Sequence, residues 1–392
     1  MPANRNQSSQ LYSKHNRVRF LETGTDFFDS LKGLIANAQK AIHIQTYIFE
    51  EDSSGQAIAS ALQDAARRKV SVYLLVDGYA SQSLSRSFVA SLTQTGIHFR
   101  FFEPVFRSRY FYFGRRMHHK IAVADGIYAI VGGRNIADRY NDLPGIPAWL
   151  DFAVLVEGDI ARSLCQLCER TWKKMIQKAL PTQCKPAMPV QIPFAEQMDI
   201  RVRRNDWVRG KNEITATYLQ LLRTAGSDVT IICSYFLPGK RIRKAISDAT
   251  RRGVAIRVIA AGRSDILLAK EAERWLYDWL LRKKVILYEY QDTILHGKLA
   301  VCDRSWVTLG SYNLNNISAY ASIELNLDIR NRDFAAGIHQ KLDRMIANHC
   351  LRITPEHLKK TNNPIKQFWR WFSYQFIRLV FYLFTFYFRQ NH

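Results

Sequence analysis

The stretch MHHKIAVADGIYAIVGGRN (117–135) decides how this chain of 392 residues folds, because its pattern returns in HGKLAVCDRSWVTLGSYN (296–313). Both stretches fit H-x-K-x4-D-x6-G-[GS]-x-N. The first copy consists of His118, Lys120, Asp125, Gly132, Gly133 and Asn135, and the second of His296, Lys298, Asp303, Gly310, Ser311 and Asn313. Six positions that recur at one spacing predict an internal duplication and one site built from two halves.

The first copy is predicted to form a β-hairpin. Residues 117–124 and 127–131 are extended candidates, and Asp125-Gly126 between them suits a two-residue turn. Glycines at the end of the second strand allow the backbone to approach a ligand closely.

Side-chain alternation selects the histidine that belongs to the motif. Successive side chains of a strand point to opposite faces, so His118 and Lys120 share one face and His119 lies on the other. We therefore expect His118 to take part in chemistry and His119 to be structural. The same alternation aligns His296 with Lys298.

Strand and helix candidates alternate around each copy of the motif. In the first half, 41–49 reads as a strand, 55–69 as a helix and 71–77 as a strand. The second half repeats this order at 227–236, 241–253 and 254–262. The fold class is therefore α/β, with two similar domains in which mixed sheets are flanked by helices.

The domain boundaries follow from composition. Four of the eleven prolines lie within 181–197, which suits a linker. We expect a basic polar N-terminus (1–17), a first domain (18–185), a linker (186–198), a second domain (199–350) and a C-terminal helix (360–392).

The two histidines together suit reactions at phosphorus. One imidazole can attack phosphorus while the other protonates the leaving alkoxide, and the residues leave open which does which. Phosphoryl transfer needs mainly positioning and positive charge, which two lysines can supply where Mg²⁺ often acts. We expect no metal and no cofactor. The candidates for holding the phosphate, besides the lysines, are Asn135, Asn313, Gly133 and Ser311.

Each imidazole also needs a group that orients its second nitrogen. Asp151 and Glu324 each open an apolar strand-like run and can place a carboxylate beside a histidine. The alternative for each is an ordinary exposed acid at the start of a strand.

Charge and cysteine content narrow the function class. A net charge of +22 implies an anionic partner, which is nucleic acid, an acidic membrane or a phosphorylated substrate. Six cysteines are few for this length, which argues against a disulfide scaffold and fits a reducing cytosol. Cys165 and Cys168 form a C-x2-C in a helix-like stretch, where we expect helix packing.

Two aromatic stretches point to a membrane. Residues 366–390, read as a helix, carry a wide apolar surface and one narrow polar or amphipathic stripe of Trp371, Gln375, Arg378, Tyr382, Thr385 and Arg389. Such a helix suits the membrane interface, although packing on the protein itself or a dimer contact would also explain it. The basic and aromatic stretch 100–116 precedes His118. It suits either a segment at the mouth of the active site that attracts anionic headgroups or a solvated loop. No secretory signal and no ordinary transmembrane helix is predicted.

The sequence resembles the phospholipase D superfamily, whose signature is the doubled H-x-K-x4-D motif. The blocks at 45–58, 74–81, 115–140 and 295–315 resemble bacterial cardiolipin synthases, in particular the shorter B-type. The resemblance implies two phospholipase D-type domains packed pseudo-symmetrically around one active site. Two positions depart from the commoner pattern, namely Gly133 in place of Ser and His119 in place of Arg.

The resemblance also implies a reaction and its residues. A phosphatidyl group passes from one phosphatidylglycerol, through a phosphatidyl-histidine, to a second, and glycerol is released. His118 would be the nucleophile, and His296 would act first as acid and then as base. Glu324 would hold His118 and Asp151 would hold His296. The motif aspartates, Asp125 and Asp303, would stabilise loops within the catalytic motif.

The expected partners are an anionic phospholipid, phosphatidylglycerol, and a membrane surface, without nucleic acid and without an obligatory protein partner. The expected location is the cytoplasmic side of a bacterial inner membrane, with peripheral or monotopic attachment. The alternatives are a phospholipase D hydrolase, another phosphatidyltransferase, a nucleic-acid phosphodiesterase, and a non-catalytic membrane-binding protein. Complete motifs argue against the last of these, and the aromatic C-terminus argues against the nuclease.

Overall fold

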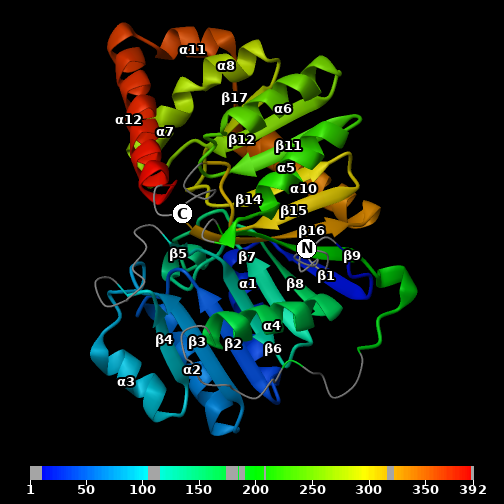
Figure 1. Cartoon of the computed structure of the whole chain (residues 1–392), viewed down its shortest axis with the longest axis vertical. Helices are drawn as coiled ribbons and strands as arrows, with labels where there is room; N and C mark the ends of the chain where they lie inside the picture. The colour runs from blue at the N-terminus through cyan, green and yellow to red at the C-terminus, as the bar shows by residue number, and fades with distance from the viewer. Residues whose placement is uncertain are drawn as a thin grey trace. The chain divides into compact units, whose positions relative to one another are not determined.

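The computed structural model describes residues 11–104, 115–173, 184, 190–206, 209–315 and 322–389 (Figure 1). The chain divides into two compact units. The first comprises Met1–Arg203 and Glu324–Ile329, and the second comprises Arg204–Ile323 and Arg330–His392. The division lies near the end of the predicted linker, but one short later segment belongs to the first unit. The boundaries expected within 186–198 stay a prediction, and 185–189 lie outside the described residues.

The first unit contains a seven-stranded mixed sheet with the order β1-β8-β7-β6-β2-β3-β4. Strands β2, β3 and β4 run parallel, and β6, β7, β8 and β1 add antiparallel neighbours. The strands are β1 (Asn16–Leu21), β2 (Ala41–Thr46), β3 (Ser71–Asp77), β4 (His98–Phe102), β6 (Lys120–Ala124), β7 (Tyr128–Gly132) and β8 (Ala153–Gly158).

Helices cover both faces of this sheet. The helices are α1 (Gly24–Asn37), α2 (Ser53–Arg67), α3 (Arg86–Gln94) and α4 (Asp159–Lys173), with a 3-10 turn η1 (Asp138–Tyr140). Ile42 and Ile44 of β2 belong to the core that α1 and α2 share. Gln45 points to the other face, where its amide donates to the carbonyl of Cys168 on α4 at 3.0 Å. Alternate side chains of β2 therefore face different helical layers.

The second unit repeats this plan. Its sheet has the order β15-β14-β11-β12-β13-β17. The strands are β11 (Asp228–Cys233), β12 (Ala255–Ala261), β13 (Ile286–Tyr290), β14 (Lys298–Cys302), β15 (Trp306–Gly310) and β17 (Cys350–Ile353). The helices are α5 (Glu213–Thr224), α6 (Lys240–Arg251), α7 (Leu267–Trp275), α8 (Tyr277–Arg282), α10 (Arg332–His349), α11 (Pro355–Thr361) and α12 (Pro364–Arg389).

The pairing pattern shows that the two units are copies of one design. β2 pairs with β3 in parallel and with β6 antiparallel, and β6 continues antiparallel to β7. In the same order, β11 pairs with β12 in parallel and with β14 antiparallel, and β14 continues to β15. The predicted fold class of two mixed sheets flanked by helices is confirmed. The predicted packing around one shared site stays a prediction.

The remaining strands are β5 (Arg116–Met117), β9 (Asp199–Asp206), β10 (Lys211–Asn212) and β16 (Ser322–Arg330), and η2 (Phe194–Glu196) is a 3-10 turn. Strand β5 pairs with β16. Within the first unit, the Arg201 guanidinium donates to the buried Asp328 carboxylate at 2.8 Å. These contacts explain why part of β16 belongs to the first unit although it lies far along the chain.

Both motif hairpins turn through left-handed residues. Asp125 and Gly126 have φ of 56° and 68°, and Asp303 and Arg304 have φ of 49° and 48°. Two successive positive φ values fit the twist of antiparallel strands. The predicted turn at Asp125-Gly126 is confirmed.

The aspartate at each turn anchors its hairpin to the start of the central strand. The Asp125 carboxylate accepts backbone N–H groups of Gln39, Lys40 and Ala41 at 2.8, 2.8 and 2.9 Å. In the second unit, the Asp303 carboxylate accepts N–H groups at the matching place. Its donors are Gly226, Ser227 and Asp228, at 2.9, 2.8 and 3.0 Å.

Two predicted features are wrong in detail. The strand expected over 117–124 is broken, because β5 ends at Met117 and β6 begins at Lys120, which leaves His118 and His119 between the strands. The expectation that Cys165 serves only helix packing is also wrong. Cys165 of α4 is bonded to Cys184, with a Cα–Cα distance of 5.5 Å. Cys168 is buried and takes no part in this disulfide.

Replacement of Asp303 by Asn tests the anchoring role. Burial alone would raise the pKa of the Asp303 carboxyl, but the backbone N–H groups outweigh it and lower the pKa to about 2. A lowered folded pKa means that this stabilisation is complete above the unfolded value of about 4 and is lost as the pH falls from there through 2. Thermal melts should therefore show Asp303→Asn less stable than the wild type at pH 7, with a difference that shrinks between pH 4 and pH 2.

Asp29→Asn is the matched control, because the Asp29 side chain is exposed and its carboxylate pairs with Lys32 of the same helix at 2.8 Å. Its melting temperature should stay close to that of the wild type at every pH. A difference for Asp303→Asn that is equally large at pH 7 and pH 2 would contradict the assignment.

Candidate active site

His118 is held by a buried carboxylate. Its Nδ1 lies 3.0 Å from Oε2 of Glu324, whose side chain is 1% exposed against 17% for the histidine. The ring also meets Tyr47 edge to face, with 4.7 Å between centroids. A carboxylate at Nδ1 fixes the ring orientation and stabilises the protonated form. The expected contact between Glu324 and His118 is present, and its effect on a reaction stays a prediction.

Each motif lysine reaches back to the backbone of its own motif histidine. The Lys120 ammonium donates to the carbonyl of His118 at 2.6 Å, and Lys298 donates to the carbonyl of His296. Lys120 also lies 5.2 Å above the Tyr47 ring, a cation–π contact. The two units therefore hold histidine and lysine in the same local arrangement.

His119 has different contacts from His118. It is fully buried, and its Nε2 lies 2.8 Å from the amide oxygen of Gln45. Because Gln45 in turn donates to α4, this contact ties the motif to the helix below the sheet. The geometry fits the structural role predicted for His119.

The motif asparagines hold loops in this structure. Asn135 accepts the N–H of Ile48 at 3.1 Å and donates to the Tyr140 hydroxyl at 2.8 Å. Asn313 accepts the hydroxyl of Ser234 at 2.7 Å. Phosphate binding by either asparagine, and by the buried Ser311, stays a prediction.

Asp151 explains the glycine at position 133. Asp151 is fully buried, and its Oδ1 accepts the N–H of Phe152 at 2.7 Å. A Cβ atom at Gly133 would lie only 2.3 Å from this Oδ1. Arg134, also buried, donates to the Asp151 carbonyl at 2.5 Å. His296 is mostly buried in the second unit, and its expected pairing with Asp151 stays a prediction.

Asp77 positions the backbone just before His118. It is fully buried at the end of β3, and its Oδ2 accepts the N–H of Met117 at 2.9 Å. Burial raises the pKa of the Asp77 carboxyl, and Arg116 at 3.4 Å opposes the rise. Since Met117 precedes His118, this bond fixes the backbone that carries the histidine.

The second unit contains a buried charge cluster beside the end of β11. Glu273 of α7 accepts the N–H of Phe236, just after β11, at 2.8 Å. Lys270 lies 2.7 Å from Glu273 and 2.9 Å from Glu289. Burial raises the pKa of Glu273, and Lys270 opposes it. Sequence patterns miss this cluster, because a Lys and a Glu three positions apart on a helix ordinarily form a surface pair.

The basic stretch before His118 is only partly described. Arg107, Arg109 and the aromatics at 111–113 lie outside the described residues. Arg115 pairs with Glu103 at 2.8 Å, and Arg116 pairs with Asp77. These two arginines therefore stabilise the segment through ion pairs, and their expected attraction for anionic headgroups stays a prediction.

Helix α12 packs on α7 through one face. Arg370 donates to Glu271 of α7 at 3.1 Å, and Ser373 beside it is fully buried. Tyr374 and Ile377 pack against the small cluster formed by Leu237, Ala272 and Leu276. Figure 1 shows the helix running alongside α7. The polar stripe predicted from the sequence does not form the face that packs on α7, since Trp371 and Arg378 are exposed.

The opposite face of α12 exposes large apolar side chains. The exposed fractions are 79% for Ile365, 62% for Phe368, 42% for Phe372, 44% for Phe376 and 54% for Leu379. Their spacing of three or four residues forms one continuous stripe. We call these five residues the apolar stripe. Within the described part of the chain, no helix is both long enough and apolar enough to cross a membrane.

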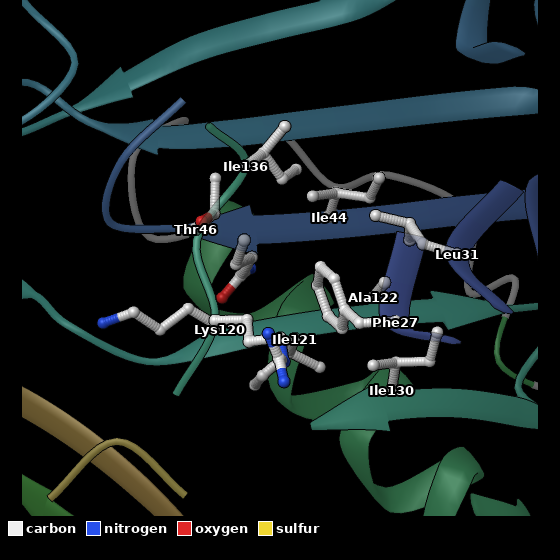
Figure 2. A pocket seen from close by; sticks show the side chains of 11 residues that line it. Phe27, Leu31, Ile44, Thr46, Lys120, Ile121, Ala122, Ile130 and Ile136 are labelled. Atoms are coloured by element: carbon white, nitrogen blue, oxygen red, sulfur yellow. The ribbon is translucent and has the colours of Figure 1, made fainter. Parts of the chain in front are cut away.

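A small apolar cavity lies beside Lys120. Figure 2 shows Phe27, Leu31 and Ile44 around it, while the Lys120 ammonium points away from them. The cavity lies among the core side chains that α1 shares with the sheet. It therefore belongs to the packing that supports the motif strands.

Comparison with known proteins identifies the family. The family described as "Cardiolipin synthase, PLD-like domain" matches residues 31–144 and 218–346, which contain both motifs. The chain belongs to this family. It is 34% identical to cardiolipin synthase B of Salmonella typhi over 360 residues, covering 88% of this chain and 84% of the relative. It is 33% identical to cardiolipin synthase B of Escherichia coli K12 over 357 residues, with the same coverage.

A solved structure supports the fold of this family member. The phosphatidylserine synthase of Haemophilus influenzae matches with a TM-score of 0.70 at 14% identity, covering 93% of each chain. At this sequence identity the match supports the fold alone. The resemblance to phospholipase D-type cardiolipin synthases inferred from the motifs is confirmed.

Introducing a side chain at Gly133 tests the role of Asp151. In Gly133→Ala, the new Cβ would clash with the buried Asp151 carboxylate, so we expect the variant to lose about 1–3 kcal/mol of stability. Chemical denaturation measures this loss. Gly33→Ala is the control, because nothing lies within 4 Å of a Cβ at Gly33 inside α1. It should leave stability unchanged or raise it, and equal losses in both variants would contradict the explanation.

Proposed function

We propose that the chain is a cardiolipin synthase that transfers a phosphatidyl group from one phosphatidylglycerol to the hydroxyl of a second. The observation that carries the proposal is His118, placed beside Lys120 and held at Nδ1 by the buried Glu324. A matching histidine and lysine in the second unit supply the other half of the chemistry. The two motifs together form one site in this proposal.

In the first step, His118 attacks the phosphorus of phosphatidylglycerol. Nε2 is the ring nitrogen that Glu324 does not hold, so this atom forms the bond to phosphorus. The bond from phosphorus to the glycerol oxygen breaks, and His296 gives that oxygen a proton. Glycerol leaves, and the phosphatidyl group remains on His118.

In the second step, a second phosphatidylglycerol supplies the acceptor hydroxyl. His296, now neutral, takes the proton of that hydroxyl while its oxygen attacks phosphorus. The bond between phosphorus and His118 Nε2 breaks, which releases cardiolipin and restores both histidines. Lys120 and Lys298 place positive charge near the non-bridging oxygens, where negative charge accumulates in the transition state.

Glu324 and Asp151 act on the histidines in this proposal. The carboxylate of Glu324 stabilises the positive charge that His118 gains when it is bonded to phosphorus. Asp151 would do the same for His296 when it carries a proton. Asp125 and Asp303 act more remotely, because each fixes the hairpin on which its histidine and lysine are mounted.

We also propose that the apolar stripe of α12 docks on the cytoplasmic face of a bacterial inner membrane, as a peripheral or monotopic attachment. The packed face of α12 is occupied by α7, so the stripe is the surface left to meet lipid. A net charge of +22 adds attraction to anionic headgroups. The substrate of the proposed reaction is itself an anionic lipid of such a membrane.

The products of purified protein test the reaction. Incubated with phosphatidylglycerol in mixed micelles with EDTA, the wild type should release glycerol and form a four-chain lipid. His118→Ala and His296→Ala should each lower the rate at least about 1,000-fold, because each removes a group that forms or breaks a bond. Mass spectrometry of lipids and a glycerol assay measure both products.

The control for these variants is His349→Ala, which removes an exposed histidine that pairs with Asp292. It should keep the wild-type rate. Phosphatidic acid as the only lipid product would favour a hydrolase. A phosphatidyl adduct that forms without His118 but not without His296 would reverse the roles of the two histidines.

Polar substitutions in the apolar stripe test membrane docking. Burying one Phe contributes about 1.5–3 kcal/mol, so Phe368→Ser combined with Phe372→Ser should lower vesicle partitioning at least about 10-fold. Sedimentation with vesicles that contain phosphatidylglycerol measures this. Gln367→Ser changes an exposed polar residue of the same helix and should leave partitioning unchanged. Undiminished pelleting of the double variant would show that α12 is not the docking element.

A further inference from the structure

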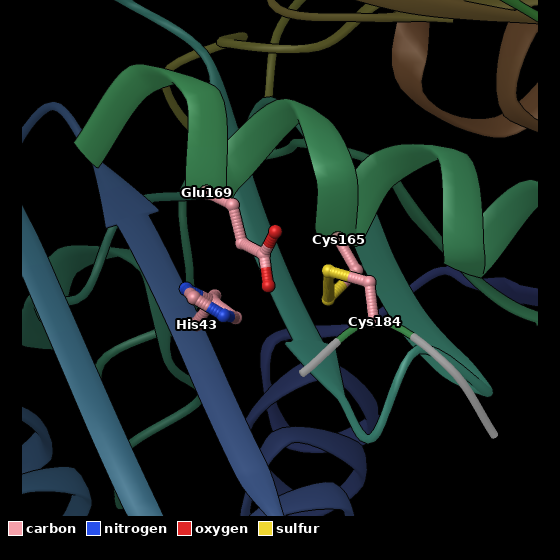
Figure 3. Close-up of side chains that lie close together, drawn as sticks. All are labelled: His43, Cys165, Glu169 and Cys184. Carbon is pink, nitrogen blue, oxygen red and sulfur yellow. A yellow bond between two sulfur atoms is a disulfide. The ribbon is translucent and has the colours of Figure 1, made fainter. Parts of the chain in front are cut away.

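Four potential metal ligands converge on the face of the first sheet that α4 covers. His43 lies on β2, Cys165 and Glu169 lie on α4, and Cys184 belongs to the chain beyond α4. One ligand atom from each lies within 4.8 Å of the others, and all four residues are buried. Figure 3 shows the His43 ring, the Glu169 carboxylate and the two sulfurs grouped between helix and strand. None of them belongs to the proposed catalytic motifs.

His43 supplies an independent sign that this cluster can take a ligand. Its residue is only 4% exposed, and its buried Nε2 has no hydrogen-bond partner among the described residues. The ring is stacked on Tyr73 with 4.8 Å between centroids and 10° between planes. Buried polar atoms normally have partners, so a fixed ring with an orphaned nitrogen beside two sulfurs calls for an explanation.

We propose that the reduced protein binds a zinc ion through His43 Nε2, the Cys165 and Cys184 thiolates and one Glu169 carboxylate oxygen. Nitrogen, sulfur and oxygen ligands of this kind suit Zn²⁺, which structural sites bind in a closed tetrahedron. Zinc bonds of about 2.0–2.3 Å place tetrahedral ligands about 3.3–3.8 Å apart. Four atoms that already lie within 4.8 Å of one another need only small side-chain rotations to reach this geometry.

The zinc site and the disulfide are alternative states of the same sulfurs. The structure has Cys165 bonded to Cys184. Two molecules of a small cytosolic thiol reduce this bond, becoming one disulfide themselves and leaving two protein thiols. Zinc then displaces the two thiol protons and binds the thiolates. An oxidant would reverse the sequence and release the ion.

Glu169 and His43 are suited to the roles assigned to them. The His43 ring is buried and held against Tyr73, so its orientation toward the cluster is fixed. The Glu169 carboxylate lies 3.9 Å from the Lys173 ammonium, one helical turn along α4. This distance leaves Lys173 as a neighbour that can balance charge around the site.

The location of Cys184 gives the site a structural consequence. A Cβ at Gly126 would lie 3.1 Å from the carbonyl oxygen of Cys184, so this residue packs against the turn of the first motif hairpin. A metal bound by Cys184, α4 and β2 would fasten the chain beyond α4 to the sheet at that turn. Gly126 follows Asp125, the residue that anchors the hairpin.

Cys168 offers a matched control, because it is buried on the same helix but is not one of the four ligands. The C-x2-C that Cys165 and Cys168 form in sequence therefore does not define the site. Only Cys165 takes part, and its partners come from 43, 169 and 184.

Metal content of the full-length protein tests the proposal. The protein is purified in detergent with a thiol reductant, equilibrated with Zn²⁺ and desalted through a weak chelator. Elemental analysis should find one zinc per chain in the wild type and in Cys168→Ser. His43→Ala and Cys184→Ser should retain less than about a tenth of that amount, since the loss of one ligand weakens a closed site.

Three outcomes would overturn the proposal. The first is that the wild type contains no zinc under reducing conditions, and the second is that Cys184→Ser retains full zinc. The third is that the Cys165–Cys184 bond is not reduced and the protein takes up no metal. Cobalt added to the reduced wild type gives a second readout that requires no variant. A thiolate-to-cobalt charge-transfer band with tetrahedral d–d bands is expected, and their absence would count against the site even if the variants fail to fold.

Discussion

The structure depends on one repeated interaction, the aspartate at each motif turn that accepts three backbone N–H groups. Asp125 fixes the hairpin to the residues that begin β2, and Asp303 does the same for β11. The lysine of each motif begins the same hairpin strand at its other end, and the histidine lies two residues before that lysine. A charged acceptor with several donors is among the stronger hydrogen-bonded arrangements in proteins. This anchor fixes the position, relative to the sheet, of the residues that we propose for chemistry.

Much of this arrangement follows from sequence patterns, and the exceptions have physical causes. The strand at 71–77 and the turn at Asp125-Gly126 are local features, which alternation and turn chemistry report directly. The position of His118 between β5 and β6 involves a partner far along the chain, because its ring contacts Glu324, 206 residues away. The grouping of His43 with Cys184 likewise depends on how α4 crosses β2. No spacing along the chain reports such contacts between distant segments.

Helix α12 illustrates how packing can override an amphipathic pattern. The stripe that looks polar in the sequence is not the face that α7 selects. That face instead carries Arg370, which finds a carboxylate in Glu271, and Ser373, which is small enough for close approach. A helix packed by such residues keeps its phenylalanines outward, which is the reverse of an ordinary surface helix. The exposed apolar area is therefore a consequence of specific contacts, and a lipid surface would bury it.

The two halves also differ in a way that the close packing of Asp151 explains. Position 133 is glycine where the matching position 311 is serine. The Asp151 carboxylate occupies the space that a Cβ at Gly133 would need, whereas the longer Glu324 extends its carboxylate to His118. A short acid must approach the backbone closely, and only a glycine leaves room for it. The departure at Gly133 is thus coupled to the choice of aspartate at 151, and the two positions are best regarded as one structural unit.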